Sequence, residues 1–198
     1  MEPLEILRRL GALQTGHFRL TSGLHSDRYM QCARLFEHPK ESAQLCAMLA
    51  DMFRSAGTAA DAVAGPAVGG IIMAYEVARA LGVRNIFAER ENGVMALRRG
   101  FRVERGERVL IVEDVVTTGG SVKEVMELLR GMGADIAGVG SIVDRSGGAA
   151  GFDADFRPLA VMDIKSWDER ECPLCARGIP IKKPGSRESC SLIQRTKH

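Results

Sequence analysis

Hydrophobic positions after residue 60 follow two alternating periods, which predict strands and helices in turn. Short apolar runs predict buried strands at residues 62–64, 85–88, 109–112 and 136–143. Between them, residues 71–81 and 122–130 place apolar side chains at helical spacing. This alternation predicts an α/β fold whose parallel sheet has right-handed crossover connections.

The two ends of the chain carry different patterns. Residues 3–10 predict a short helix, and residues 38–55 predict a longer one with Met48 and Phe53 in the core. A last strand is expected at residues 159–164, after which proline, cysteine and charge dominate and periodicity is lost. We expect one domain over residues 1–198, made of an N-terminal hood with helices (1–58), a core (59–165) and a tail (166–198).

The most informative segment is residues 109–121, Val-Leu-Ile-Val-Glu-Asp-Val-Val-Thr-Thr-Gly-Gly-Ser. Its glycines and hydroxyls lie between a strand and a helix, where backbone N–H groups and the helix N-terminus favour a phosphate. The acid pair Glu113 and Asp114 precedes this turn, and carboxylates accept strong hydrogen bonds from sugar hydroxyls. Both features suit a ribose 5-phosphate.

This segment resembles the phosphoribosyl pyrophosphate (PRPP) motif of the type I phosphoribosyltransferases. The resemblance implies that fold, with a central parallel sheet flanked by helices and a small N-terminal hood. It also implies a PRPP site formed by Glu113, Asp114, Val115, Val116, Thr117, Thr118, Gly119, Gly120 and Ser121. The alternative is an ordinary strand and helix with an acidic, solvated strand end.

Residues 16–30 indicate the subgroup. Phe18 and Leu20 alternate with Arg19 and Thr21 before a turn, which predicts a small hairpin lid. This segment resembles the hood of the orotate phosphoribosyltransferases. A surface hairpin without ligand contact is the alternative.

A base-binding residue is expected after the strand at residues 136–143. Arg145 follows this strand, and a guanidinium can hold a planar carboxylate through two parallel hydrogen bonds. The resemblance implies that Arg145 contacts orotate and that Thr117 lies near the same base. The alternative for Arg145 is a surface ion pair with Asp144 or another neighbour.

The resemblance also places a pyrophosphate loop at residues 65–70, with Ala67, Val68 and Gly69 binding PRPP through backbone groups. Many relatives carry an aromatic residue and a lysine where this chain has Val68 and Gly69, so a side-chain role there is weakened.

Residues 87–101 correspond to a loop that in many relatives brings lysines and a histidine over the diphosphate. This chain has neither type of residue in that range, and Arg90 is the closest match to one of those cations, with Arg98 and Arg99 further on. The alternative is a charged hairpin held by Glu89 and Glu91. Which arginine replaces the lysine is left open.

The implied activity is that of a pentosyltransferase of UMP biosynthesis, in which orotate and PRPP give orotidine 5′-monophosphate and diphosphate. Glu113, Asp114 and Arg90 are the expected catalytic residues. Mg²⁺ is expected on the diphosphate without a direct protein ligand, and relatives imply a homodimer. The alternatives are a purine phosphoribosyltransferase and a non-catalytic nucleotide-sensing regulator of the same fold.

Composition limits the other partners. The net charge is +2 and the chain has one tryptophan and two tyrosines, so we expect no nucleic-acid binding. The sequence has no apolar run of about 18 residues, so we expect no membrane insertion. Five cysteines suit a reducing, cytoplasmic environment. Cys172 and Cys175 have the spacing of a zinc half-site, and only Cys190 and His198 lie nearby in sequence to complete it. We therefore interpret the pair as a turn in the tail, with zinc or a redox pair as the alternative.

Overall fold

The computed structural model describes residues 2–184, and the chain divides into two units. The larger unit holds residues 1–13 and 31–163, and the smaller holds residues 14–30 and 164–198. This division does not follow the boundaries expected after residues 58 and 165, which stay predictions.

A six-stranded sheet forms the centre of the larger unit. Its strands lie in the order β5 (Val94–Leu97), β4 (Arg84–Glu91), β3 (Ala62–Pro66), β6 (Arg108–Val116), β7 (Asp135–Asp144) and β8 (Phe156–Val161). All neighbours are parallel except β4 and β5, which form an antiparallel hairpin. The predicted parallel sheet is confirmed. The expected last strand at residues 159–164 begins and ends three residues earlier, as β8.

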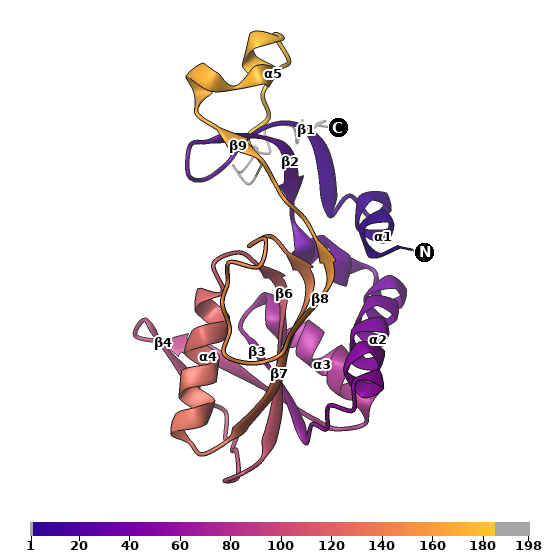
Figure 1. Cartoon of the computed structure of the whole chain (residues 1–198), viewed down its shortest axis with the longest axis vertical. Coiled ribbons are helices and arrows are strands. Elements are labelled where there is room, and N and C mark those ends of the chain that lie inside the picture. The colour runs from indigo at the N-terminus through magenta and orange to yellow at the C-terminus, as the bar shows by residue number, and fades with distance from the viewer. Residues whose placement is uncertain (1, 185–198) are drawn as a thin grey trace, which may run out of the picture. The chain divides into compact units, whose positions relative to one another are not determined.

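Helices cover both faces of this sheet, as Figure 1 shows. The β3-to-β4 crossover through α3 (Gly69–Leu81) and the β6-to-β7 crossover through α4 (Gly120–Gly131) run in opposite directions along the sheet. Since such crossovers are right-handed, α3 and α4 lie on opposite faces. The helix α2 (Pro39–Ser55) packs beside α3, while α1 (Pro3–Arg9) and the 3₁₀ helix η1 (Cys32–Glu37) precede α2.

The core of the larger unit is close-packed around β6 and β7. Residues 109–112 are fully buried, as expected of a central parallel strand. On β7, Gly138 and Gly140 face Phe53 of α2 so closely that an added Cβ would lie 2.9 Å from its ring. Phe53 is 1% exposed, which confirms its predicted core position, whereas Met48 is half-buried.

The smaller unit is built on a three-stranded sheet in the order β1 (Leu13–Arg19), β2 (His25–Met30) and β9 (Ser166–Trp167). The hairpin predicted at residues 16–30 is confirmed by the adjacent β1 and β2. The tail, expected to lack regular structure, contains β9, a 3₁₀ helix η2 (Glu169–Glu171) and a short helix α5 (Pro173–Ala176).

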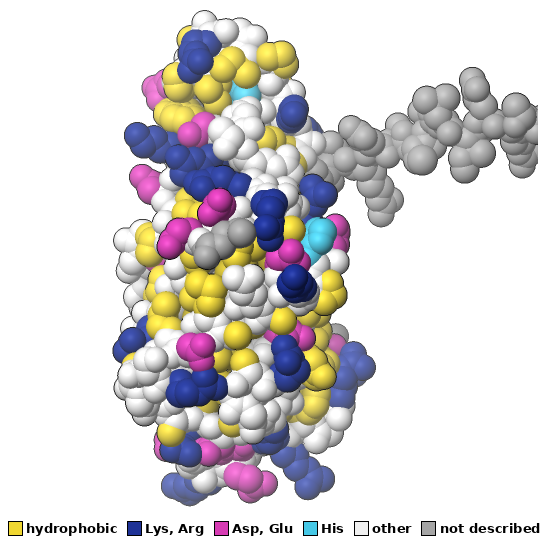
Figure 2. All heavy atoms as spheres, turned by 90° about the vertical axis from the view of Figure 1, so that its right-hand side faces the viewer, with side chains coloured by type: hydrophobic (Ala, Val, Ile, Leu, Met, Phe, Trp, Pro, Cys, Tyr) yellow, Lys and Arg dark blue, Asp and Glu magenta, His cyan; other side chains and the backbone are white. Residues whose placement is uncertain are grey.

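Charged residues are dispersed over the surface. On the face drawn in Figure 2, Lys and Arg side chains are interspersed with Asp and Glu. Within the larger unit, Arg84 pairs with Glu107 at 2.6 Å and Arg108 pairs with Asp61 at 2.6 Å. In residues 2–184, no helix has the length and apolar character needed to cross a membrane.

Candidate functional site

The predicted site residues of the core meet at the carboxyl edge of the larger sheet. Arg90 lies on β4, residues 67–69 follow β3, the acid pair ends β6 and Arg145 follows β7. These four strands are consecutive in the sheet order. The chain turns in opposite directions from β3 and β6, so a topological switch point, where open α/β sheets bind ligands, lies between these two strands.

At this switch point the pyrophosphate loop lies against the acid pair. A Cβ added to Gly69 would lie 3.0 Å from Oδ2 of Asp114, so only a glycine lets the loop backbone come this close. The backbone N–H of Val115 donates to Oδ1 of Asp114 at 2.8 Å, and that of Asp114 donates to Oε1 of Glu113 at 3.3 Å. Both carboxylates are thus oriented by the strand that carries them.

Burial shifts the titration of the acid pair. Desolvation raises the pKa of Glu113 to about 8, and the neighbouring Asp114 carboxylate adds to the rise. Desolvation also raises the pKa of Asp114. Two carboxylates held this close in a poorly solvated place favour protons, or hydroxyl and cationic partners supplied by a ligand.

The phosphate turn encloses a small hollow between β6 and α4. Its lining comprises Glu113, Val115, Val116, Thr117, Thr118, Gly119, Gly120, Ser121 and Val122, around a volume of about 60 Å³. Gly119 adopts φ 75°, and a Cβ there would lie 2.8 Å from the ring of Phe152. The turn therefore needs a glycine at this position for both conformation and space.

Arg145 and Thr117, the two residues that the resemblance assigns to orotate binding, lie close to each other along the backbone. The backbone N–H of Arg145 donates to the carbonyl of Val116 at 2.8 Å, which brings the end of β7 next to the start of the phosphate turn. The guanidinium Nε is buried without a hydrogen-bond partner among the described residues, and desolvation lowers the pKa of Arg145. The alternative pairing with Asp144 is not found, because that carboxylate accepts the backbone N–H groups of Ser146 and Gly148.

Cys32, which no sequence motif indicates, lies near the same residues. Its thiol is 4% exposed, and desolvation together with the charge of Asp114 raises its pKa, while Arg145 lowers it. A lone cysteine at the start of a 3₁₀ helix has no spacing pattern that could reveal this position.

The charged hairpin given as the alternative for residues 87–101 is present, but its glutamates do not hold Arg90. The guanidinium of Arg90 pairs with Glu124 of α4 at 2.7 Å and donates to the carbonyl of Gly93 at 2.9 Å. Glu89 and Glu91 pair instead with Arg99 and Arg98. A diphosphate role for Arg90 stays a prediction and requires exchange of Glu124 for the ligand.

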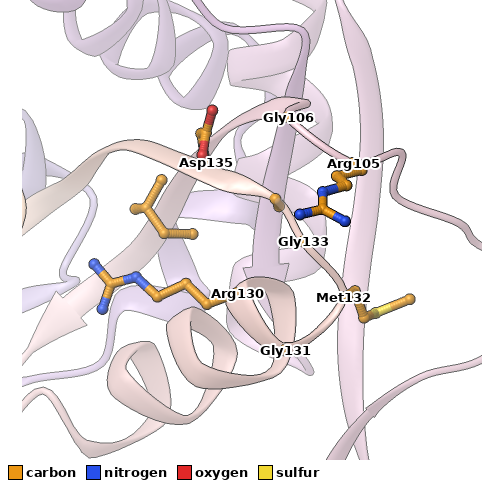
Figure 3. Close-up of a pocket in the computed structure, with 9 residues that line it drawn as sticks. Arg105, Gly106, Arg130, Gly131, Met132, Gly133 and Asp135 are labelled. Atoms are coloured by element: carbon orange, nitrogen blue, oxygen red, sulfur yellow. The ribbon is translucent and has the colours of Figure 1, made fainter.

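A larger hollow, of about 840 Å³, lies elsewhere on the larger unit. It is lined by the segments before β6 and β7, including Arg105 and Arg130 (Figure 3). Those segments belong to the amino edge of the sheet, and Arg130 is paired with Asp153 at 2.7 Å. Size alone does not make it the site, since the predicted site residues and the two carboxyl groups with raised pKa values, Glu113 and Asp114, lie at the carboxyl edge.

Comparisons with known proteins show the family to which the chain belongs. The phosphoribosyl transferase domain family matches residues 31–170. An orotate phosphoribosyltransferase of Caldanaerobacter subterraneus subsp. tengcongensis is 56% identical over 93% of this chain and 96% of the relative. One from Thermotoga maritima is also 56% identical, over 92% of this chain and 97% of its own.

Solved structures show the same fold. The orotate phosphoribosyltransferase from Aeropyrum pernix has a TM-score of 0.68 at 25% identity and covers 80% of this chain and 92% of its own. The orotate phosphoribosyltransferase of Mycobacterium tuberculosis H37Rv in complex with inorganic phosphate has a TM-score of 0.66 at 26% identity, over 80% and 93% of the two chains.

Proposed function

Because the chain belongs to the orotate phosphoribosyltransferases, we propose that it transfers the ribose 5-phosphate of PRPP to orotate, giving orotidine 5′-monophosphate and diphosphate. The observation that carries the site assignment is the close approach of Gly69 to Asp114 at the switch point. This approach brings the pyrophosphate loop and the acid pair of β6, which are far apart in sequence, together at one place for a phosphorylated sugar.

In this proposal the PRPP molecule lies over the carboxyl ends of β3 and β6, at the switch point. The backbone N–H groups of residues 118–121 bind the 5-phosphate at the start of α4. Glu113 and Asp114 accept hydrogen bonds from the ribose hydroxyls, and backbone groups of Ala67, Val68 and Gly69 bind the diphosphate.

Orotate then lies toward β7. The half-buried guanidinium of Arg145, with its unpartnered Nε, suits the orotate carboxylate, and Thr117 lies beside the base. This arrangement aims the base nitrogen at the anomeric carbon, where positive charge develops as diphosphate leaves. The nearby carboxylates favour that charge.

The residues also fit Mg²⁺ bound with the diphosphate. Magnesium prefers oxygen ligands and keeps several waters, and the half-buried carboxylates of Glu113 and Asp114 favour a cation. We propose that ligand oxygens and water hold the ion, with Glu113 and Asp114 as its nearest protein charges. When bound, Mg²⁺ neutralises charge on the leaving diphosphate.

We further propose a homodimer that works in the cytoplasm. Val68, Ile72 and Tyr75 are 82%, 48% and 56% exposed along the start of α3, where such apolar side chains suit a subunit contact. Cys32, Cys46, Cys172 and Cys175 are free cysteines, as expected of a reducing compartment.

Turnover tests the proposed reaction. With PRPP and Mg²⁺ present, the ultraviolet absorbance of orotate should fall as orotidine 5′-monophosphate forms, and Asp114→Asn should slow this reaction. Consumption of adenine or hypoxanthine but not orotate would indicate a purine enzyme. Tight PRPP binding without turnover of any base would indicate the non-catalytic nucleotide-sensing regulator. The feature that lends this alternative some weight is the absence of lysine and histidine from residues 87–101.

A further inference from the structure

Four metal-binding side chains meet in the smaller unit, whereas the residues assigned to PRPP and orotate belong to the larger unit. They are His17 of β1, His25 of β2, and Cys172 and Cys175 at the start of α5. One ligand atom from each side chain lies within 4.8 Å of all the others. Figure 1 shows β1, β2, β9 and α5, the elements of this unit.

The distances between these atoms lie within about 0.2 Å of those around a tetrahedral metal ion. Bonds of about 2.0–2.3 Å from zinc to nitrogen and sulfur give tetrahedron edges of roughly 3.3–3.8 Å. Nε2 of His17 lies 3.1 Å from Nδ1 of His25, 3.5 Å from Sγ of Cys172 and 3.7 Å from Sγ of Cys175. Nδ1 of His25 lies 3.2 Å from Sγ of Cys175.

The orientation of His17 also fits a metal ligand. Its Nδ1 lies 2.7 Å from the carbonyl oxygen of Ile179. A carbonyl can only accept, so Nδ1 carries the proton and Nε2 presents its lone pair to the cluster in the neutral ring. Metal-bound histidines are commonly oriented by such a bond from the other ring nitrogen to a backbone carbonyl.

Burial shows why this unit needs such a cluster. Within residues 14–30 and 164–184 the buried side chains are His17, Phe18, His25, Ser26 and Cys172. Phe18 is thus the one large hydrocarbon side chain buried there, and three of the five are members of the cluster. Units this small usually require disulfides or metals, because their apolar cores are too small.

We propose that His17, His25, Cys172 and Cys175 bind one structural Zn²⁺ ion that fastens the hairpin of β1 and β2 to the C-terminal segment. Two thiols and two imidazoles in tetrahedral reach are a set that zinc prefers, and four protein ligands leave no open position for catalysis. On binding, the two thiols release their protons to solvent and no electrons are transferred.

This proposal corrects the interpretation of Cys172 and Cys175 as a turn in the tail. Cys172 precedes helix α5 and Cys175 lies within it, and the completing ligands come from the hairpin rather than from the nearby sequence. Cys190 and His198, the earlier candidates, lie outside the described residues. The competing interpretation is a metal-free hydrogen-bonded cluster or a redox-active pair of thiols.

Metal content tests the proposal directly. The full chain, purified without added metal ions and dialysed, should retain one zinc per chain in elemental analysis. Native mass spectrometry should show the mass of the chain plus one zinc less two protons. Substitution by Co²⁺ should give the visible absorption of a tetrahedral ion with thiolate ligands. Zinc that dialysis removes, or a Cys172–Cys175 disulfide in the untreated protein, would overturn the proposal.

Ligand variants provide the residue-level test. Cys175→Ser and His25→Gln should lose tightly held zinc, whereas Cys175→His, which keeps a ligand, should retain it. Cys46→Ala and His38→Gln, in the larger unit, are the matched controls and should keep one zinc per chain. Equal zinc content in ligand and control variants would refute the assignment.

A readout in the unmodified protein avoids variants that fail to fold. Trp167, the single tryptophan, lies on β9 opposite His25. Chelation should change its fluorescence and lower the melting temperature, and added Zn²⁺ should restore both. Complete removal of zinc with no change in Trp167 emission or melting temperature would contradict the structural role.

Discussion

Arg145 differs from the other arginines of the carboxyl edge because its guanidinium Nε is buried and has no hydrogen-bond partner among the described residues. Arg90, Arg98 and Arg99 are exposed and paired with glutamates, which typically contributes little to stability. In Arg145, the burial of Nε without a hydrogen-bond partner among the described residues costs free energy until a ligand accepts a hydrogen bond from it. The residue is therefore better explained by binding than by folding.

Replacing Arg145 by Ala should raise the Michaelis constant for orotate by about 10- to 100-fold, since a charge-assisted pair is worth roughly 1.4–2.8 kcal/mol. The constant for PRPP should change far less. Arg145→Lys should not restore orotate binding, because lysine lacks the planar fork. Arg130→Ala, at the opposite edge, serves as the control. Equal effects on both substrates would tell against a carboxylate clamp.

Glu113 makes the free energy of unfolding depend on pH. Its pKa is about 8 in the folded chain against an ordinary 4.5, so between these values the folded chain binds more protons than the unfolded chain. Stability should therefore fall as pH rises from about 4.5 to about 8, by at most about 5 kcal/mol from this group.

Glu113→Gln should remove most of this pH dependence, because glutamine cannot ionise. Urea unfolding of both proteins at about pH 5 and about pH 8 measures it. Glu37→Gln, at an exposed position of η1, should leave the dependence unchanged. A parallel loss of stability in wild type and Glu113→Gln would show that another group is responsible.

At the scale of elements, the turn from β3 into α3 depends on the missing Cβ of Gly69, the first residue of α3. Gly69→Ala should push the loop away from Asp114 and raise the Michaelis constant for PRPP several-fold, since the added Cβ would lie 3.0 Å from Oδ2. Gly131→Ala, at the end of α4, meets nothing within 4 Å and should leave PRPP use unchanged. Steady-state kinetics of the two variants, if indistinguishable, would remove the loop from the PRPP site.

Elements with a strong local period could be predicted from sequence. The strands and helices of the core, and the turn at residues 117–121, depend on neighbouring residues alone. The strand β5, with four residues, was expected only within the alternative of a charged hairpin, whose turn is formed by Asn92 and Gly93 at φ 51° and 86°.

Contacts between distant segments could not be predicted. Nothing local links His17 to Cys172, which lie 155 residues apart in sequence. The close approach of Gly69 to Asp114 likewise depends on the strand order, which places β3 beside β6. The motifs thus predicted the chemistry of the carboxyl edge, whereas the contacts between residues far apart in sequence follow only from the fold.

At the scale of the whole molecule, the exposed apolar side chains at the start of α3 predict self-association. Light scattering coupled to size exclusion should show a dimer for the wild type and a monomer for Tyr75→Arg, because a charge in an apolar contact is costly. Val161→Arg, at another exposed apolar position, is the control and should remain dimeric. A monomeric wild type, or a dimer unaffected by Tyr75→Arg, would contradict this surface.

The central claim is that PRPP binds at the carboxyl ends of β3 and β6, where the chain turns in opposite directions from the two strands. A crystal structure of the chain with PRPP and Mg²⁺ tests it most directly. We expect the 5-phosphate on the N–H groups of residues 118–121, the ribose hydroxyls on Glu113 and Asp114, and the diphosphate beside Gly69. A sugar phosphate bound at any other place, such as the hollow at the amino edge, would contradict the account.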